Sequence, residues 1–216
     1  SGIKESCDVY FYQLSKKIGI DNIAKVAREF GLGEISSLGF ENEKPGIVPN
    51  KKWKKKFLKE NWYGGETLIN AIGQGYVLTT PLQLAVMTAR IASDGKKIEP
   101  TLFKQEFNKE FKKINVNSRN LKLIKDSMYK VVNEPGGTAF SSRSEQYDYS
   151  GKTGTSQVTK ISLEERESED FRKKDLEWKS KDHALFVGYM PTIKPKYAIS
   201  VVVEHGGSGS ATAAPI

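Results

Sequence analysis

The chain has 216 residues, of which 38% are hydrophobic, enough to form a globular core. Lysine and arginine outnumber aspartate and glutamate by 34 to 26, and the resulting net charge of +8 favours anionic neighbours such as a membrane surface, nucleic acid or an acidic polymer. A single cysteine excludes an internal disulfide, and the sequence contains neither an apolar run long enough to span a bilayer nor a signal-peptide pattern.

Two short helices are predicted at the start of the chain. The first covers residues 8–17, and Ser6 or Asp8 is expected to cap it, because either side chain can accept a hydrogen bond from the free N–H groups of the first turn. The second covers residues 21–30, and a glycine follows each helix as a stop signal. The apolar face expected for the second helix consists of Ile23, Val26, Ala27 and Phe30.

Residues 31–61 contain several glycines and prolines and are predicted to form a loop. The basic run over residues 51–57 lies inside it. Its interleaved lysines and aromatic residues could contact a polyanion, but a solvated loop with two anchoring rings is the preferred interpretation. Residues 62–75 are interpreted as a tight connection packed under the active cleft. They end in a lone Gly-x-Gly without a phosphate-loop pattern, a weak indication of nucleotide binding.

Two further helices are predicted in the middle of the chain. Thr80 caps the first, and Pro81 occupies its first turn, where a missing N–H does no harm. A turn at Asp94-Gly95 and an extended pair over residues 97–114 lead to the second helix, which Asn117 or Ser118 is expected to cap and which ends at about Asn133. The residues expected to face the core are Leu82, Val86 and Ala89 in the first helix and Leu121, Ile124, Met128 and Val131 in the second.

Three strands are predicted in the last third of the chain, over residues 149–158, 184–189 and 197–204. The last two are joined by a short link and are expected to be antiparallel neighbours. Of the 18 residues in 164–181, 13 are charged, so residues 159–181 are predicted to be a charged, mobile insertion. A glycine- and serine-rich stretch is expected to close the sheet with a flexible turn. With helices first and strands last, the predicted fold class is α+β, an antiparallel sheet covered by helices.

The first predicted strand carries Lys152-Thr153-Gly154-Thr155, a composition typical of a strand that borders a cleft. A cation beside hydroxyls suits an anionic ligand. Gly154 removes the side chain where a substrate backbone would approach, so that the strand can offer its N–H groups to that substrate. The alternative is an ordinary strand with a glycine bulge.

Other kinds of site find little support in the sequence. With His183, His205 and Cys7 as the chain's histidines and cysteine, no metal-ligand spacing can be assembled, and neither a metal nor a cofactor is predicted. The numbers of serine, histidine and acidic residues do not exclude a serine–histidine–carboxylate triad. However, no Gly-x-Ser-x-Gly pattern is present, and neither histidine has a recognisable catalytic context. His183 is expected to cap or pack at the start of a strand.

Four short motifs occur in an order that resembles one protein family. They are Ser6-Cys-Asp8, Ile72-Gly-Gln-Gly-Tyr76 followed by Thr80-Pro-Leu-Gln83, Gly137-Thr-Ala139 and Lys152-Thr-Gly-Thr155. Together they resemble the transpeptidase domain of class B penicillin-binding proteins over nearly the whole chain. The stretch from Trp62 to Tyr76 is most similar to the elongation-type branch, penicillin-binding protein 2.

This resemblance implies a penicillin-binding and β-lactamase-like transpeptidase fold and the activity of a peptidoglycan D,D-transpeptidase. In the family, a serine attacks the D-Ala-D-Ala carbonyl of a stem peptide, an amine from a neighbouring stem resolves the acyl-enzyme, and β-lactams inhibit the reaction. Lys152 would supply positive charge to the cleft and to the terminal carboxylate. The hydroxyls of Thr153 and Thr155 would bind that carboxylate beside Gly154, and the Thr155 N–H would form half of the oxyanion hole.

The resemblance also implies a role for the first motif. Ser6 would relay protons between the nucleophile's neighbourhood and the leaving amine, within hydrogen-bond reach of Lys152. Asp8 stands where many relatives have asparagine, and a carboxylate there adds negative charge near lysines. The alternative is that Ser6 and Asp8 are helix caps only.

The family's nucleophilic serine, followed by a lysine one helical turn later, should precede Ser6 by several elements. Ser1-Gly-Ile-Lys4 matches Ser-x-x-Lys as letters but is rejected, because that motif needs a buried helix of its own. Residues 1–216 are therefore expected to be the C-terminal part of a transpeptidase domain, truncated at both ends. This part would hold the second and third motifs without the nucleophile and would be inactive alone.

The partners implied by the resemblance are peptidoglycan stem peptides, β-lactams and a membrane glycosyltransferase of the elongation machinery. The implied location is the periplasmic face of the bacterial cytoplasmic membrane, through an N-terminal anchor absent from this chain. Two other classes of function remain as alternatives. One is a catalytically silent sensor or scaffold domain. The other is a nucleic-acid-binding module built on residues 51–57, which leaves the ordered motifs unexplained, so no nucleic-acid partner is expected.

Overall fold

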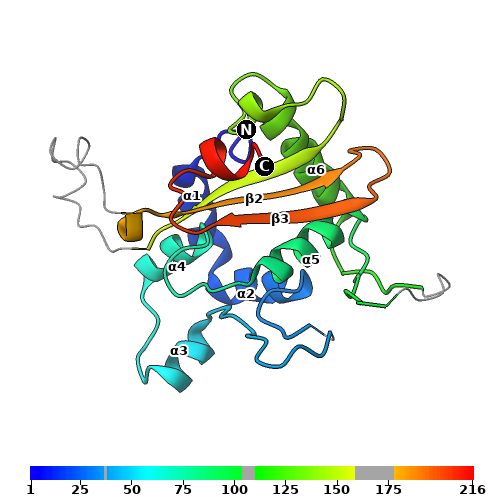
Figure 1. The fold of residues 1–216 in the computed structure, drawn as a ribbon. Helices are drawn as coiled ribbons and strands as arrows, with labels where there is room; N and C mark the ends of the chain where they lie inside the picture. Colours follow the sequence, from blue (N-terminus) through cyan, green and yellow to red (C-terminus); the bar gives the residue numbers. More distant parts are fainter. Residues whose placement is uncertain (37, 104–109, 159–177) are drawn as a thin grey trace, which may run out of the picture.

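The structure of the protein, a computed structural model, describes residues 1–36, 38–103, 110–158 and 178–216. The helices are α1 (Asp8–Ile18), α2 (Ile20–Glu29), α3 (Lys51–Phe57), α4 (Gly64–Ala71), α5 (Pro81–Ala92) and α6 (Ser118–Asn133). The strands are β1 (Ser150–Ser156), β2 (His183–Met190) and β3 (Tyr197–Val203), and three short helical turns are η1 (Phe140–Ser142), η2 (Trp178–Ser180) and η3 (Gly209–Ala213). Figure 1 shows the sheet at the centre, with α5 below it and η3 and both chain ends above it.

The three strands form one antiparallel sheet in the order β1-β2-β3. Lys152 of β1 lies opposite Val187 of β2, and Ala184 of β2 lies opposite Val203 of β3. The predicted α+β fold, an antiparallel sheet covered by helices, is therefore confirmed. Because β1 is an outer strand of this sheet, one side of its backbone is left for other contacts.

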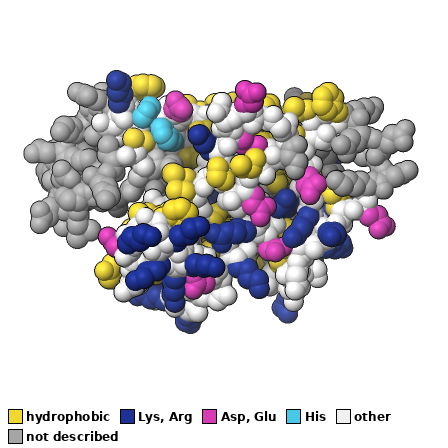
Figure 2. All heavy atoms as spheres, turned by 90° about the horizontal axis from the view of Figure 1, so that it is seen from below, with side chains coloured by type: hydrophobic (Ala, Val, Ile, Leu, Met, Phe, Trp, Pro, Cys, Tyr) yellow, Lys and Arg dark blue, Asp and Glu magenta, His cyan; other side chains and the backbone are white. Residues whose placement is uncertain are grey.

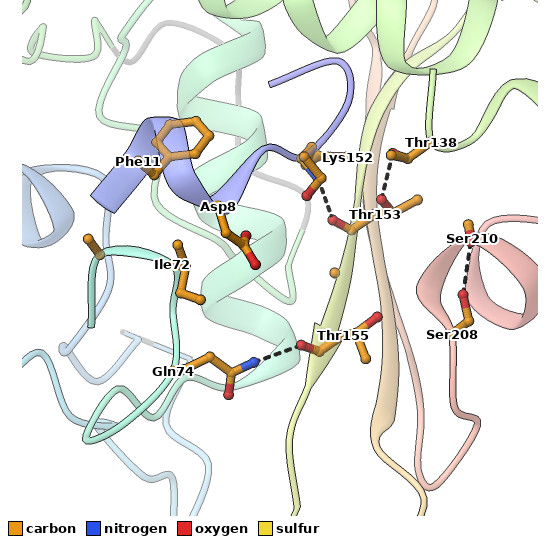
Figure 3. A pocket seen from close by; sticks show the side chains of 13 residues that line it. Asp8, Phe11, Ile72, Gln74, Thr138, Lys152, Thr153, Thr155, Ser208 and Ser210 are labelled. Carbon is orange, nitrogen blue, oxygen red and sulfur yellow. Dashed lines mark hydrogen bonds between the residues drawn. The ribbon is translucent and has the colours of Figure 1, made fainter. Parts of the chain in front are cut away.

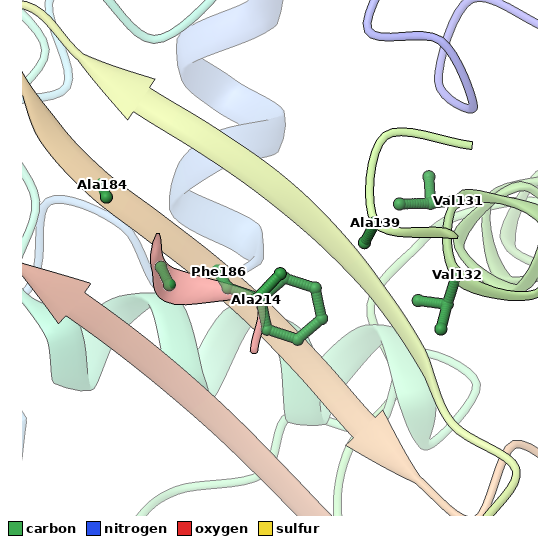
Figure 4. Close-up of a cluster of buried hydrophobic side chains, with 7 residues drawn as sticks. Val131, Val132, Ala139, Ala184, Phe186 and Ala214 are labelled. Carbon is green, nitrogen blue, oxygen red and sulfur yellow. The ribbon is translucent and has the colours of Figure 1, made fainter. Parts of the chain in front are cut away.

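Each face of the sheet has its own apolar cluster, because alternate residues of β2 point to opposite faces. On one face, Ala184 and Phe186 pack with residues of α6 and η3 (Figure 4). On the other face, Tyr189 packs with Ala92 of α5 and Met128 of α6. The helix α6 contributes to both clusters and so fixes the position of β1, along which it packs.

The four helices predicted from the sequence are confirmed, close to their predicted bounds, as α1, α2, α5 and α6. Two of the expected caps are also confirmed. The Thr80 side chain accepts a hydrogen bond from the Gln83 N–H at 3.2 Å, and the Asn117 side chain accepts one from the Arg119 N–H at 2.8 Å.

The buried faces of these helices differ in part from the prediction. In α2 the predicted face largely holds, since Phe30 is buried and Ile23 and Ala27 are half-buried, but the predicted core residue Val26 is 51% exposed. Ile20 and Ala24, which were not predicted, are buried on the same helix, which packs against α1 and α4. In α6 the prediction largely holds, since Leu121, Met128 and Val131 are buried and Ile124 is half-buried.

The buried face of α5 is more polar than predicted. The expected core residues Leu82, Val86 and Ala89 are half-buried, and the buried residues are Gln83, Thr88, Arg90 and Ala92. The side chains of Gln83 and Arg90 each donate to two main-chain carbonyl oxygens of neighbouring segments. A pattern of apolar residues misses them because these carbonyls, rather than other apolar groups, stabilise their burial.

The prediction of an unbroken loop over residues 31–61 is wrong, because Lys51–Phe57 form the helix α3. The Asn50 side chain caps it by accepting from the Trp53 N–H at 2.7 Å. Lys54, 1% exposed, forms ion pairs with glutamates outside the helix. The basic run is thus a helix with one buried lysine, not a wholly solvated loop.

The segment of residues 62–75 contains the helix α4 as well as a tight connection. The Glu66 side chain accepts from the Tyr63 N–H at 2.8 Å and so caps the start of this helix. The segment was predicted to pack under a cleft, and its last residues, Ala71, Ile72 and Gln74, line one.

The remaining connections were predicted with mixed success. Asp94 and Gly95 form the expected turn, both with positive φ. Of the predicted pair over residues 97–114, the described residues show one bridge, between Lys96 and Lys113, and residues 104–109 lie outside the described part. Within the predicted insertion at 159–181, residues 159–177 likewise lie outside it, and η2 follows them. The stretch expected to be a flexible turn after β3 leads directly into η3. Among the described residues, none of the helices combines the length and the apolar composition of a membrane span.

Candidate active site

A cleft of about 550 Å³ opens along the outer edge of β1. Its walls come from segments far apart in the sequence: the start of α1, the end of α4, β1 itself and the residues around the start of η3 (Figure 3). The lining residues are Ser6, Asp8, Phe11, Ala71, Ile72, Gln74, Thr138, Lys152, Thr153, Gly154, Thr155, Ser208 and Ser210. Every site residue predicted from the sequence is among them.

The turn that carries Ser6 is closed by main-chain hydrogen bonds. The helix α1 begins at Asp8 with Cys7 as its N-cap and no side-chain cap bond, so the expected capping by Ser6 or Asp8 is wrong. Ser6 has a φ of 52°, a left-handed conformation that is uncommon for a residue with a side chain. The Cys7 N–H donates to the Gly2 carbonyl oxygen at 2.9 Å. This turn leaves the Ser6 hydroxyl free to face β1.

Lys152 reaches from β1 to the Ser6 turn. Its Nζ donates to Ser6 Oγ at 2.9 Å and to the Thr153 carbonyl oxygen at 2.8 Å. Burial lowers the pKa of Lys152 to about 8, and the negative charge of Asp8 opposes this shift. Lys152 can therefore release and recover a proton near neutral pH, and the Ser6 hydroxyl is placed to exchange it.

Asp8 adds a carboxylate to the opposite wall of the cleft. It is the first residue of α1, where the helix dipole favours negative charge. Figure 3 shows its carboxylate pointing into the cleft beside Ile72. The cleft thus has an acidic group on its helix side and Lys152 on its strand side.

The edge of β1 also presents hydroxyl and main-chain groups. Thr155 Oγ1 accepts from the Gly209 N–H at 3.4 Å, and the Thr155 carbonyl oxygen accepts from the Gln74 side chain at 2.9 Å. Gln74 in turn accepts from the Gln157 N–H at 3.3 Å, so its amide pairs with the strand edge. The N–H and C=O groups of one residue in an antiparallel strand point to the same side, so the Thr155 N–H faces the cleft as well.

Gly154 leaves space in the middle of this edge. A Cβ atom there would meet Leu185 Cβ at 3.4 Å, an ordinary contact, so packing within the described residues does not require glycine. The pairing of β1 with β2 runs without interruption from Ser150 to Ser156, and the alternative of a glycine bulge is therefore wrong. We still expect position 154 to be a glycine because the backbone of a substrate approaches the strand there.

Several lining residues were given no role by the sequence. Thr138 Oγ1 lies 2.7 Å from Thr153 Oγ1, and the hydroxyls of Ser208 and Ser210 lie 2.8 Å apart. Thr138 and Gln74 belong to motifs that carried the family resemblance, which was a usable signal. Ser208 and Ser210 lie in a glycine- and serine-rich stretch that indicated no more than a turn.

The two histidines lie together outside the cleft. His183 starts β2, as expected, and its Nδ1 accepts from the His205 N–H at 2.9 Å. In the part of the chain that the structure describes, no three His, Cys, Asp or Glu side chains come together as a possible metal site. The residues that line the cleft offer hydroxyls, an ammonium group, a carboxylate, an amide and the edge of a strand.

The chain belongs to the penicillin-binding protein transpeptidase domain family, whose model matches residues 1–216. Among curated relatives, it is 37% identical to the peptidoglycan D,D-transpeptidase MrdA of Acinetobacter baumannii, over 98% of this chain and 32% of that protein. It is 33% identical to MrdA of Haemophilus influenzae, over 99% of this chain and 34% of that protein. The chain thus spans about a third of the length of these relatives.

Solved structures give the same result. Pseudomonas aeruginosa PBP2 in complex with WCK 5153 is similar with a TM-score of 0.83 and 36% identity, over 100% of this chain and 46% of that chain. PBP2 of Helicobacter pylori in complex with MreC is similar with a TM-score of 0.82 and 39% identity, over 97% of this chain and 36% of that chain. The predicted penicillin-binding transpeptidase fold and its likeness to the elongation-type branch are confirmed.

Proposed function

We propose that the protein is a peptidoglycan D,D-transpeptidase, which cross-links D-Ala-D-Ala stem peptides through a serine acyl-enzyme and is inhibited by β-lactams. One observation carries the proposal. The ammonium of Lys152 and the hydroxyl of Ser6, 146 positions apart in a chain of this family, meet at 2.9 Å inside the cleft. The 216 residues would supply the part of the site that binds the substrate and moves protons.

The strand edge fits the terminal carboxylate of a peptide. Lys152 and the hydroxyls of Thr153 and Thr155 lie together on β1 and would bind that carboxylate through charge-assisted hydrogen bonds. The Thr155 N–H would stabilise the oxyanion of the tetrahedral intermediate, and removing one such donor typically costs about a hundredfold or more in rate. Gly154 would let the peptide backbone approach the strand.

The Ser6 turn fits a proton relay. The contact of 2.9 Å is short enough for direct transfer between Lys152 and Ser6, from which the proton would pass to the leaving amine. A pKa of about 8 keeps both protonation states of Lys152 accessible near neutral pH. Asp8 would favour the charged form of Lys152 while the carboxylate is bound.

We propose that the nucleophilic serine and its lysine lie outside residues 1–216. Three strings match Ser-x-x-Lys as letters, beginning at Ser1, Ser93 and Ser127, and none of their residues is among those that line the cleft. The lysine of the first string, Lys4, pairs with Glu134 at 3.2 Å. We therefore expect the 216 residues alone to be inactive. In this proposal they are the C-terminal part of a transpeptidase domain that continues beyond both ends.

Labelling with a fluorescent penicillin tests the proposal. The full-length protein should give a covalent band after denaturing electrophoresis, and the 216-residue chain should give none. Ser6→Ala and Ser1→Ala variants of the short chain are the matched controls. A band from the short chain that is lost in Ser6→Ala would make Ser6 the nucleophile, and one lost in Ser1→Ala would identify the first string as the motif. A full-length protein that neither gives a band nor cross-links D-Ala-D-Ala peptides would overturn the transpeptidase proposal.

A catalytically silent sensor or scaffold would share the fold and the cleft. Such a protein would bind a β-lactam or a peptide without turnover. Release of D-alanine from a D-Ala-D-Ala substrate by the full-length protein separates an enzyme from this alternative.

A basic surface favours one other class of function. Figure 2 shows lysine and arginine side chains gathered on the face of the molecule that contains α3. The exposed lysines in and after this helix are Lys51, Lys52, Lys55, Lys56 and Lys59. These lysines could bind a polyanion with an affinity that depends on salt, but such a function would not explain the cleft. We therefore propose no nucleic-acid partner.

The neighbours support a set of partners for the proposed enzyme. PBP2 of Helicobacter pylori was solved in complex with MreC, and another neighbour belongs to a peptidoglycan synthase complex that coordinates polymerisation and cross-linking. We propose that the protein likewise acts beside a membrane glycosyltransferase of the elongation machinery, on stem peptides and with β-lactams as inhibitors. Its proposed location is the periplasmic face of the bacterial cytoplasmic membrane, through an N-terminal anchor outside this chain.

A further inference from the structure

Thr138 contacts both halves of the cleft. Its N–H donates to the Lys4 carbonyl oxygen at 3.2 Å, in the turn that carries Ser6. Its Oγ1 lies 2.7 Å from Thr153 Oγ1 on β1 (Figure 3). The ion pair of Lys4 with Glu134 at 3.2 Å ties the same turn to the end of α6. Thr138 therefore stands where the Ser6 turn, α6 and the strand edge meet.

The segment that carries Thr138 is firmly placed. The next residue, Ala139, is fully buried and donates its N–H to the Val131 carbonyl oxygen at 3.0 Å. The preceding residue, Gly137, donates its N–H to the Glu134 carbonyl oxygen, also at 3.0 Å. Because the backbone is fixed on both sides, the Thr138 hydroxyl has a defined position relative to β1.

The direction of the bond between Thr138 and Thr153 decides what Thr153 can do. Either hydroxyl can be the donor, and each has one proton. An ionised carboxylate only accepts hydrogen bonds, so Thr153 must point its proton at a bound carboxylate. The contact between the two threonines then persists only if Thr138 is the donor.

We propose that Thr138 is a positioning residue: it donates its hydroxyl proton to Thr153 and thereby directs the Thr153 proton toward the carboxylate of the ligand. This inference rests on the proposed function, which places a carboxylate at Thr153. Hydrogen bonds in a row polarise one another, so the bond from Thr138 also strengthens the bond from Thr153 to the carboxylate. Without Thr138, the Thr153 hydroxyl can rotate toward other acceptors.

The test uses the full-length protein and two substitutions. Thr138→Val removes the hydroxyl at nearly constant shape, and Thr138→Ser keeps it. With benzylpenicillin, we expect Thr138→Val to lower the second-order acylation rate about three- to tenfold, the effect of one hydrogen bond. The loss should come from weaker initial binding and not from slower acylation of the bound drug. Thr138→Ser should stay within about twofold of the wild type.

A double-mutant cycle separates positioning from a general structural effect. In a Thr153→Val background, Thr138→Val should cause no further loss, because the hydroxyl it orients is gone. Thr101→Val, the same change at an exposed hydroxyl outside the cleft, is the matched control and should change nothing. Equal losses in both backgrounds, or a Thr138→Ser variant as weak as Thr138→Val, would overturn the inference.

Equilibrium binding of the dipeptide D-Ala-D-Ala to the full-length protein gives a readout that needs no acylation. The same dependence on Thr138 and Thr153 is expected there. A wild type that binds the dipeptide but is not acylated would contradict the proposed function and leave the positioning role supported. A wild type that binds neither ligand would overturn both, because Thr153 would then hold no carboxylate.

Discussion

At the scale of single residues, Lys152 shows how strongly the surroundings determine the chemistry. Burial lowers its pKa from 10.5 to about 8, although Asp8 opposes the shift. Between these two pH values, the unfolded chain binds more protons at this residue than the folded protein does. The residue therefore costs stability below about pH 8, and the cost disappears as the pH rises toward 10.5.

The direction of this pH dependence of stability gives a prediction for Lys152→Met. Relative to the wild type, the variant should gain more in melting temperature at pH 7 than at pH 10, because the cost that it removes is fully present at the lower pH. The gains in melting temperature at the two pH values should differ by a few degrees. For a chain of this size, each kcal/mol of stability corresponds to about 2–4 °C in melting temperature. Thermal melts followed by circular dichroism measure them, with the exposed Lys52→Met as the matched control. Equal shifts of Lys152→Met at both pH values would contradict the lowered pKa.

The site residues were predictable to different degrees. Ser6, Lys152 and Thr155 lie in strings whose order resembles a known family, so their meeting could be predicted. The left-handed turn at Ser6 could not, because the local main-chain bonds that close it, such as that from the Cys7 N–H to the Gly2 carbonyl oxygen, follow no sequence pattern, and a further bond comes from Thr138, more than a hundred residues away. The hydroxyl pair of Ser208 and Ser210 carries no sequence signal, since its position depends on how η3 packs.

At the scale of elements, α3 is the clearest departure from the sequence prediction. Its seven residues lack the periodic apolar face that identifies a helix. What stabilises it is the buried Lys54. Burial alone would lower the pKa of Lys54, but hydrogen bonds to Glu66 at 2.5 Å and to Glu60 at 3.3 Å outweigh burial and raise it. The ammonium also lies 4.5 Å from the centre of the Tyr63 ring.

Lys54→Met should therefore destabilise the protein, whereas the same change at its neighbour should not. Removing the ammonium leaves the largely buried Glu66 carboxylate without its positive partner, although it keeps hydrogen bonds from the Tyr63 N–H and the Tyr76 hydroxyl, and the melting temperature should fall by about 5–10 °C. Lys55 is exposed, and Lys55→Met should stay within about 2 °C of the wild type. Thermal melts of the two variants at neutral pH compare them. Equal melting temperatures of the two variants would contradict the stabilising role of Lys54 in α3.

Elements with a strong pattern were predicted well, and elements held by polar groups were not. The helix α6 and the strands β2 and β3 have apolar residues at the expected spacing, and their bounds agree with the sequence. The buried Gln83 and Arg90 of α5 depend on carbonyl groups of distant segments, which no local pattern reveals.

At the scale of the whole molecule, the cleft exists because the turn before α1 and the start of η3 meet at β1. Ser6 of that turn contacts Lys152, and Gly209, the first residue of η3, donates to Thr155. Figure 1 shows both termini above the same region of the sheet. The order of the motifs predicted the contact between Ser6 and Lys152. The contact between Gly209 and Thr155 could not be predicted in this way, because it requires the backbone of η3 to pack directly against the backbone of the sheet. A Cβ atom at Gly209 would overlap the carbonyl oxygens of Gly154 and Leu185.

The two glycines of this contact should therefore respond differently to alanine. Gly209→Ala forces η3 away from the sheet, and overpacking of this kind costs about 1–3 kcal/mol, so the melting temperature should fall by about 3–10 °C. At Gly154 a Cβ atom has room, and Gly154→Ala should stay within about 2 °C while slowing acylation of the full-length protein by a β-lactam, because the added methyl group meets the ligand. Thermal melts and acylation rates of both variants test the pair. If Gly154→Ala proved the more destabilising, the glycine would serve the fold, and the open edge of β1 would lose its role as the place where a peptide backbone lies.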